Sequence, residues 1–499
     1  MTELSRLAAR TLLASFDGAT VPSWMRRRIE AGLGGVCLYD TNPLHANAIG
    51  ELTSALHETD PSLITCLDEE GGDVTRLHYG EGSPHAGAAV LGAADDLALT
   101  EAVARDIGRE LHAYGVDLDL GPVADVNSNP ANPVIGVRSF GADADLVARH
   151  TAAWVSGLQS TGVGACLKHF PGHGDTVADS HLALPVAGAP RELLAARELL
   201  PFRAGAQAGA VAVMTSHVVV PAIDREQPAT LSAAVTQVLR DPTPRGGVGF
   251  TGLLISDALD MAGASGTIGI PAAAVRALQA GVDLLCLGPS HTDESVGAVE
   301  QAIIKAVEAG ELAEARLIEA AGRVAAAVDR MHELRCATPT LGVPAEPSDS
   351  ASARAARAAV SVSGALPSLA GAHVMRLVTG TNLAVGVVPW GLSGGGVVLA
   401  GRAADDVHEH EELPPIDPQG PLVVVVRDAV RYPWVMARLR EIAGRAPGVV
   451  VVELGWPRVE LGQSLPGVTV VHSYGASAVS AAAVDAALAG APTRQEARS

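Results

Sequence analysis

The chain of 499 residues is long enough for two or three domains, and its 48% of hydrophobic residues can build large cores. A formal net charge of −20 argues against nucleic-acid binding, because the phosphates would be repelled. No apolar run reaches the ~18 residues that span a bilayer, and charges interrupt the N-terminal stretch MTELSRLAARTLLASFDG. We therefore expect no membrane segment and no secretory leader. Four of the five cysteines lie in apolar runs, so we expect them to be buried thiols of a cytoplasmic protein.

Short apolar runs alternate with Ala-rich helical stretches up to about residue 336. The runs are continuously apolar, as expected of parallel strands that helices cover on both faces. They span residues 34–40, 63–68, 115–122, 162–169, 210–217, 252–257 and 281–288. Segments between them, such as ALTEAVARDIGRELHAYG, have helical spacing and end in glycine. This alternation predicts either a (β/α)8-type (TIM) barrel, with one strand still unassigned, or a doubly wound sheet.

The ends of the runs favour the barrel. Most runs end in ionisable residues, namely Asp40, Asp68, Lys168, His169, His217 and Asp257. In a barrel the carboxyl ends of all strands meet on one face, where active sites are built, whereas a doubly wound sheet spreads them along an edge. We therefore expect a catalytic (β/α)8-type barrel over residues 1–336.

The stretch KHFPGHGDTVADSH, residues 168–181, places many ionisable groups after a predicted strand. Pro171 ends that strand, and the glycines permit a tight loop over the barrel mouth. Residues two apart in an extended segment point to the same side, so Asp179 is placed to hydrogen-bond one ring nitrogen of His181. Such a bond sets the tautomer of the imidazole and raises its basicity, as a general acid/base requires.

Three interpretations of this loop compete. A metal site would use His169, His173 and His181 with an aspartate, and a structural loop would simply expose the histidines. Lys168 would repel a cation, and no further set of histidines and cysteines at ligand spacing is evident. An acid/base site also accounts for the lysine and the glycines, so we favour it and expect no metal and no cofactor.

The segment LLISDALDM places Asp257 at the end of a buried strand. A nucleophilic carboxylate at this position would face the histidine loop, whereas the alternative role for Asp257 is that of a helix N-cap. Asp260 is expected to be a first-turn charge favoured by the helix dipole. Because Lys168 and Asp68 are expected at the same face, we favour Asp257 as the nucleophile.

A linker is predicted at residues 337–350, where ATPTLGVPAEPSDS has three prolines and no periodicity. Residues 351–499 show a second, smaller α/β pattern with fewer polar strand ends. His408 and His410 lie in the acidic run DDVHEHEEL, for which we expect a solvated loop and no metal shell. This C-terminal domain is expected to supply no catalytic group, and its role stays open.

Five motifs along residues 10–335 resemble the β-N-acetylglucosaminidase branch of glycoside hydrolase family 3. In chain order they are LDEEGGDVTRL, GPVADVNSNPANPVIGVRSFG, KHFPGHGDTVADSHLALP, VMTSHVVVPAID and ISDALDM. The resemblance implies that Asp257 is the nucleophile and that His181, with Asp179 as its partner, is the acid/base. It also implies substrate-binding residues, which are Asp68, Arg138, Lys168, His169, Arg76 and His217. Glu69 is a departure, since glutamine is commoner there in the family.

Retaining glycoside hydrolysis needs a carboxylate nucleophile and a proton donor, and a histidine tuned by a carboxylate suits the second task near neutral pH. We expect a metal-independent, retaining β-N-acetylglucosaminidase that releases terminal GlcNAc from small chitin- or peptidoglycan-derived glycosides, as in cell wall recycling. The alternatives are a β-N-acetylglucosaminide phosphorylase with the same residues, a non-catalytic sugar-binding protein and a metal hydrolase. The expected partner is the small-molecule substrate, while the aglycone and the oligomeric state are left open.

Overall fold

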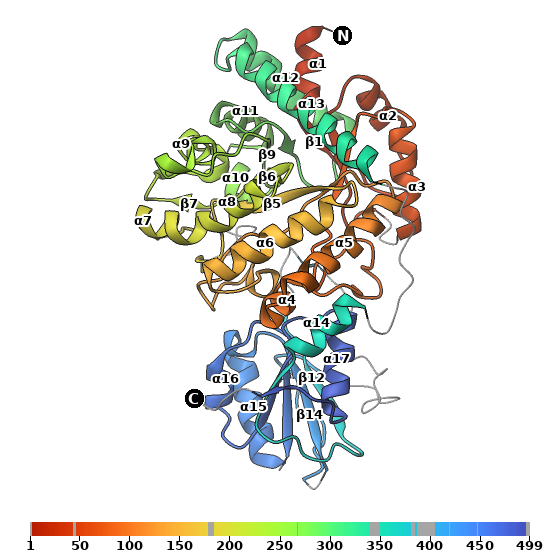
Figure 1. Ribbon diagram of the computed structural model, residues 1–499, viewed down its shortest axis with the longest axis vertical. Coiled ribbons are helices and arrows are strands. Elements are labelled where there is room, and N and C mark those ends of the chain that lie inside the picture. Colours follow the sequence, from red (N-terminus) through yellow and green to blue (C-terminus); the bar gives the residue numbers. More distant parts are fainter. Residues whose placement is uncertain are drawn as a thin grey trace.

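Two α/β parts lie one above the other along the long axis of the molecule, a barrel and a smaller part with an open sheet (Figure 1). The computed structural model describes residues 2–42, 46–177, 184–266, 268–338, 350–380, 385–386, 405–418, 420–446 and 448–495. Within these residues, no helix is long and apolar enough to cross a membrane.

Eight parallel strands form the wall of the barrel, in the order β10-β1-β2-β3-β4-β5-β6-β9. A parallel bridge between Ile255 and Leu284 joins the two outer strands and closes the ring. The strands are β1 (Leu12–Ala14), β2 (Gly35–Cys37), β3 (Ile64–Leu67), β4 (Leu118–Asp119), β5 (Gly164–Phe170), β6 (Ala212–Thr215), β9 (Leu253–Ile255) and β10 (Leu285–Cys286). The predicted barrel is therefore confirmed over the doubly wound sheet.

The strand that the sequence left unassigned is β1, between β10 and β2. It is three residues long and follows helix α1 (Glu3–Arg10) almost directly. Leu12 pairs with Leu285 on one side, and Leu13 pairs with Gly35 on the other. Only Thr11 separates β1 from α1, so the apolar residues of the strand continue those of the helix and the sequence shows no boundary between the two elements.

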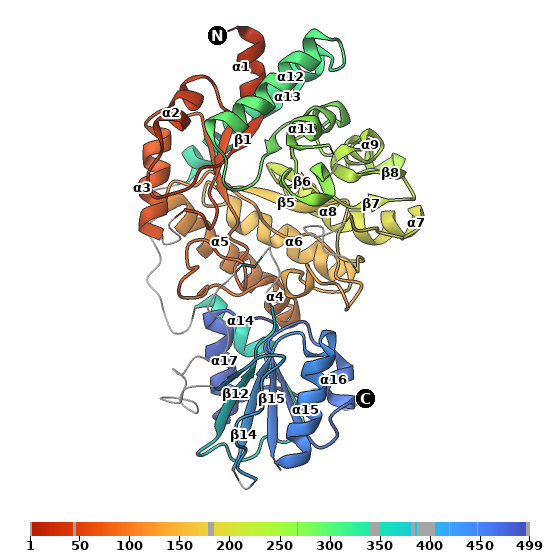
Figure 2. The ribbon, with the colours of Figure 1, turned by 180° about the vertical axis from the view of Figure 1, so that it is seen from behind.

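Helices surround the barrel, and the long pair α5 and α6 pack against each other (Figures 1 and 2). Each of these two helices begins with an aspartate cap: Asp96 accepts hydrogen bonds from Ala98 N and Leu99 N, and Asp143 accepts one from Leu146 N. The principal helices are α2 (Ser23–Glu30), α3 (Ala46–His57), α4 (Ala88–Ala94), α5 (Leu97–Ala113), α6 (Ala144–Gln159), α8 (Leu199–Gln207), α9 (Ala233–Arg240), α11 (Ile270–Ala280), α12 (Asp293–Glu308) and α13 (Glu314–Ala337).

The smaller part is built on a seven-stranded sheet, in the order β13-β12-β14-β15-β16-β11-β17. Its strands are β11 (Ser361–Ser363), β12 (His373–Leu377), β13 (Asp405–Val407), β14 (Leu422–Val426), β15 (Val449–Glu453), β16 (Thr469–His472) and β17 (Arg494–Gln495), and its helices are α14 (Ala351–Ala359), α15 (Pro433–Arg445), α16 (Val459–Gln463) and α17 (Ala478–Leu488). The predicted second α/β pattern is thus confirmed. Residues 339–349, most of the predicted linker 337–350, lie outside the described residues, so the domain boundaries stay a prediction.

A buried ion pair joins the two parts. Arg427, directly after β14, places Nη2 2.6 Å from Asp73 Oδ2, and the side chains are only 6% and 1% exposed. Asp73 Oδ1 also accepts a hydrogen bond of 2.7 Å from Ala476 N. Burial lowers the pKa of Arg427, but the neighbouring carboxylates, of which Asp73 has the largest effect, together outweigh it and the net pKa is raised. Helix α14 adds apolar packing against α4 and α5 of the barrel.

Arg427→Met should destabilise the protein, because Asp73 is left buried without its cation. Breaking a buried pair from one side costs about 3–5 kcal/mol. The matched control is Arg376→Met on β12, whose partner Asp406 lies 2.6 Å away in an exposed pair worth less than about 1 kcal/mol. The measurement is the shift in Tm of both full-length variants, and equal small shifts would contradict the structural role of Arg427.

Candidate active site

A cavity of about 360 Å³ opens at the carboxyl ends of the barrel strands. Most of the residues predicted for the site line its wall, namely Asp68, Arg76, Arg138, Lys168, His169 and Asp257. Of the described residues of the smaller part, only Gly386 reaches the wall, beside the contact of Val385 with Val74. Among the described residues that line the cavity, the charged groups therefore all come from the barrel.

Glu70 is the centre of a buried ionic network in this cavity, and the sequence analysis gave it no role. Its Oε1 lies 2.6 Å from Lys168 Nζ and 2.7 Å from Arg138 Nη2, and its Oε2 accepts from Arg138 Nε at 3.0 Å. Lys168 also donates to Asp68 Oδ1 at 2.7 Å. Burial raises the pKa of Glu70, but Arg138 and Lys168 outweigh it and hold that pKa far below its usual range. Glu70 is therefore anionic and fixes both cations.

His169 is oriented by Asp125, a second carboxylate that the sequence analysis did not single out. His169 Nδ1 lies 2.7 Å from Asp125 Oδ2, so this ring nitrogen carries the proton and donates it. His169 Nε2 then accepts from Arg138 Nη2, 3.4 Å away, in its cavity-facing position. Burial raises the pKa of Asp125, but the contact with His169 and the hydrogen bond of 2.7 Å from His173 N to Asp125 Oδ1 act in the opposite direction, and the net pKa falls below the usual value.

Asp257 follows β9 and contributes its carboxylate to the cavity wall. Its Oδ1 accepts from Ala258 N at 2.8 Å, and its own backbone N donates to Thr215 Oγ1 at 3.3 Å. The next helix, α10 (Ala262–Ser265), begins after Met261, so Asp257 is not a helix N-cap. The expectation that Asp260 is a first-turn charge is wrong for the same reason: Asp260 lies in the turn before α10 and also lines the cavity.

His217 is placed differently from the other predicted binding residues. It is buried, and its ring nitrogens bond to Thr230 Oγ1 at 2.8 Å and to Ala258 O at 2.9 Å. It is absent from the cavity wall, so in this structure His217 supports the backbone next to Asp257.

The predicted acid/base pair, Asp179 and His181, lies outside the described residues, which stop at 177 and resume at 184. The described start of this loop is closely packed. His173 is buried, and its Nδ1 shares a hydrogen bond of 2.9 Å with Thr176 Oγ1. Burial lowers the pKa of His173 to about 4. A Cβ on Gly174 would lie 1.8 Å from Val126 O, so only glycine fits there. His173 therefore brings no charge to the site at neutral pH.

The chain is similar to a known protein family and to known proteins. Residues 29–327 match the family model described as the glycosyl hydrolase family 3 N terminal domain. The chain is 37% identical over 300 residues to a β-hexosaminidase of Xylella fastidiosa (strain 9a5c), an alignment that covers 58% of this chain and 86% of that protein. It is 36% identical over 275 residues to β-hexosaminidase A of Pseudoalteromonas piscicida, where it covers 50% of this chain and spans 45% of that longer protein.

A solved structure resembles both parts of the chain. It is a glycoside hydrolase family 3 β-N-acetylglucosaminidase from Paenibacillus sp. strain FPU-7, with a TM-score of 0.85 and 30% sequence identity. The alignment covers 99% of this chain and 98% of that one, so the smaller α/β part is included in the similarity.

Glu198 lies next to Gly172, in the described start of the loop that follows β5, and is only 2% exposed. A Cβ at Gly172 would lie 2.9 Å from its side chain, and Arg197 Nε donates to Glu198 Oε1 at 2.5 Å. Glu198 Oε2 has no hydrogen-bond partner among the described residues. Burial raises the pKa of Glu198 to about 7, although Arg197 opposes the shift.

The stability of the protein should therefore fall as pH rises from 4.5, the usual pKa of this group, through about 7. A folded pKa raised above the unfolded one favours folding fully at low pH, and this advantage of about 3 kcal/mol at most is lost above the folded pKa. Glu198→Gln should remove this part of the pH dependence of Tm, whereas Glu192→Gln at an exposed position of the preceding helix should retain it. A Glu198→Gln profile parallel to that of the wild type would contradict the assignment.

Proposed function

The chain belongs to glycosyl hydrolase family 3, and on that premise we propose that it is a retaining β-N-acetylglucosaminidase. Its substrates are small chitin- or peptidoglycan-derived glycosides, from which it releases the terminal GlcNAc. The observation that carries the proposal is that Asp257 and the network of Glu70, Lys168 and Arg138 border one cavity of about 360 Å³. The names of the relatives, β-hexosaminidases and a β-N-acetylglucosaminidase, support the choice of sugar.

Asp68, Lys168 and Arg138 bind hydroxyls of the terminal sugar. Burial raises the pKa of Asp68, but Lys168 and Arg76 outweigh it and the net pKa is lowered, so Asp68 is an anionic acceptor. Lys168 and Arg138 offer only donors, and Glu70 holds their positions before the substrate binds. Such an arrangement orients a sugar ring without reorganisation of the site, which supports binding at the carboxyl ends of β3 and β5.

In the first step, Asp257 attacks the anomeric carbon while the bond from that carbon to the leaving oxygen breaks, and His181 gives its proton to this oxygen. In the second step, water attacks the same carbon, His181 takes the proton from water, and the bond to Asp257 breaks. Asp179 holds the imidazole in the required tautomer. The hydrogen bond from Ala258 N to Asp257 Oδ1 supports this role, because it fixes the orientation of the carboxylate.

The activity is assigned to a reducing compartment, the cytoplasm. All five cysteines are free thiols, and the four in apolar runs are buried as expected. Free thiols are typical of the cytoplasm, where disulfides do not persist.

The product should be free GlcNAc, with water and not phosphate as the acceptor. A neutral histidine does not repel a phosphate dianion, so the acid/base residue alone does not decide between the two. Lys168 and Arg138, however, both pair with Glu70, which reduces the positive potential left for phosphate.

The test is product analysis from a synthetic β-GlcNAc glycoside with and without phosphate at ~10 mM, a level above typical substrate constants. GlcNAc in both buffers supports the hydrolase, whereas dominant GlcNAc-1-phosphate with a raised rate would establish the phosphorylase.

Asp257→Ala should lower kcat more than about 10⁴-fold on every substrate, since a covalent nucleophile is lost. His181→Ala and Asp179→Ala should lose about 10²–10⁴-fold on an alkyl β-GlcNAc glycoside and much less on a nitrophenyl one, which needs little protonation to leave. Asp260→Ala is the matched control for Asp257 and should lose far less.

A mechanism-based fluorosugar should label Asp257 in the wild type, as mass spectrometry of peptides would show. Label on Asp68 or Asp260 would refute the nucleophile, as would proof that the acetamido oxygen attacks in its place. Equal losses of His181→Ala on both leaving groups would refute the acid/base assignment.

A further inference from the structure

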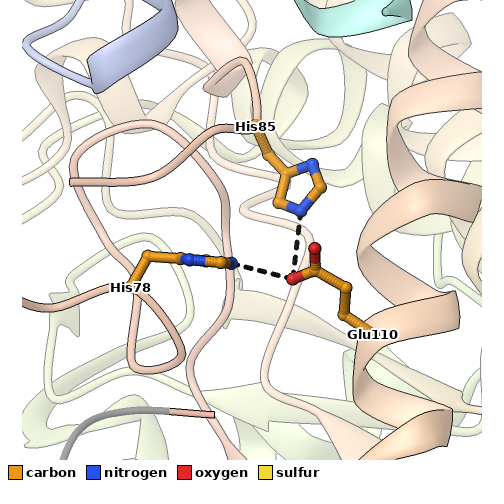
Figure 3. Close-up of side chains that lie close together, drawn as sticks. All are labelled: His78, His85 and Glu110. Carbon is orange, nitrogen blue, oxygen red and sulfur yellow. Dashed lines mark hydrogen bonds and ion pairs between the residues drawn. The ribbon is translucent and has the colours of Figure 1, made fainter. Parts of the chain in front are cut away.

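Three side chains with the chemistry of metal ligands meet outside the active-site cavity, at the seam between the barrel and the smaller part (Figure 3). His78 and His85 lie in the loop between β3 and α4, and Glu110 lies near the end of α5. None of the three has a role in the proposed reaction, so the group requires an explanation of its own.

The geometry of the group is convergent. His78 Nε2 lies 2.8 Å from Glu110 Oε2, and His85 Nε2 lies 3.3 Å from the same oxygen. The two imidazole rings stand edge to face, with centroids 5.9 Å apart, and all three ligand atoms lie within 4.8 Å of one another.

The group is incompletely satisfied in the absence of a ligand. His85 is 6% exposed, and its Nε2 has no hydrogen-bond partner among the described residues, because the contact with Glu110 lacks hydrogen-bond geometry. A buried polar atom of this kind in a native protein calls for a partner, such as water or an ion. This atom, His85 Nε2, points toward the Glu110 carboxylate, so an ion placed between the two side chains would contact both (Figure 3).

A cavity of about 490 Å³ adjoins the three side chains and gives access to them. Its far wall comes from the smaller part, through residues of α14 and α17. The charged residues of its lining are Glu81, Asp106, Glu110 and Arg357, so carboxylates outnumber guanidinium groups three to one. The excess of negative charge in the lining favours a cation, and the volume of the cavity leaves room for a water ligand.

We propose that His78, His85 and Glu110 bind one divalent transition-metal ion of the zinc class, with water from the cavity as the fourth ligand. Two imidazoles and one carboxylate form a ligand set typical of Zn²⁺, whereas Mg²⁺ and Ca²⁺ prefer oxygen ligands. Tetrahedral zinc places its ligand atoms about 3.3 Å apart. The observed 3.3 Å between His85 and Glu110 meets this spacing, and the 2.8 Å between His78 and Glu110 needs to open by about 0.5 Å. The ligand nitrogens of His78 and His85 lie within 4.8 Å of one another, so any approach that zinc requires of them is at most about 1.5 Å.

The bound ion would join the loop of residues 68–87 to helix α5. The same loop carries Asp68, Glu70 and Arg76 to the active site and Asp73 to the smaller part. The ion would thus stabilise the folded chain through a connection that neither the sugar nor the reaction supplies. The inference is independent of the proposed activity.

The test uses the full-length chain after treatment with a chelator. Equilibrium dialysis against Zn²⁺ at pH 7.5, with metal content determined by mass spectrometry, should give one Zn²⁺ per chain at about 10 µM free metal, and Zn²⁺ should raise Tm. Co²⁺ in place of Zn²⁺ should give the visible absorption of a four-coordinate site. A chain that binds no Zn²⁺ at this concentration would overturn the proposal.

His85→Gln and Glu110→Gln should each weaken the binding of Zn²⁺ more than about 100-fold, since changes outside the ligands themselves already cost 10–100-fold. The control is His57→Gln, because His57 pairs with Asp117 over 2.9 Å elsewhere on the barrel without a second histidine. Circular dichroism identifies a variant that fails to fold, and the other variant then decides. Zn²⁺ binding that persists in a folded His85→Gln or Glu110→Gln protein, or that is lost in folded His57→Gln, would overturn the site.

Discussion

The active site depends on one shared carboxylate. Glu70 is buried, and removal of its charge from water is tolerated only because Lys168 and Arg138 both contact it. These three residues belong to different segments of the barrel, after β3, in β5 and in the short helix at Gly136–Arg138. A single electrostatic requirement therefore determines the positions of two cations, and Lys168 in turn holds Asp68 through a hydrogen bond of 2.7 Å.

The segment that carries Glu70 is also bound by the smaller part of the protein. Asp73 lies three residues after Glu70 and pairs with Arg427 of the smaller part, so the chain between them is fixed at both ends by buried charges. The smaller part thus contributes to the site without placing a charged side chain from its described residues in the cavity. In this glycoside hydrolase the smaller part therefore supports the loop that carries Asp68 and Glu70 to the cavity.

The sequence predicts the architecture well because parallel strands buried on both faces must be apolar and the active-site face must be polar. Asp68, Lys168 and Asp257 were found by their position after such runs, and all three line the cavity. Glu70 and Asp125 were not found, since their roles arise from partners far along the chain; the acidic triplet at residues 68–70 was the available signal for Glu70. Strand β1 was missed because it follows α1 after one residue and its apolar residues merge with those of the helix. His217 contacts protein atoms that only the folded chain brings near.

The position of β1 in the ring has a consequence for biosynthesis. Ser15 Oγ, just after β1, donates to Gly288 O across 273 residues, and β1 itself pairs with β10. In a nascent chain, the backbone groups of β1 that pair with β10 therefore stay unpaired until β10 has left the ribosome. At about 5–20 residues per second this interval lasts tens of seconds. Ring closure is for this reason a late, non-local event, of the kind that makes folding slow and leaves strand edges exposed to chaperones and to other chains.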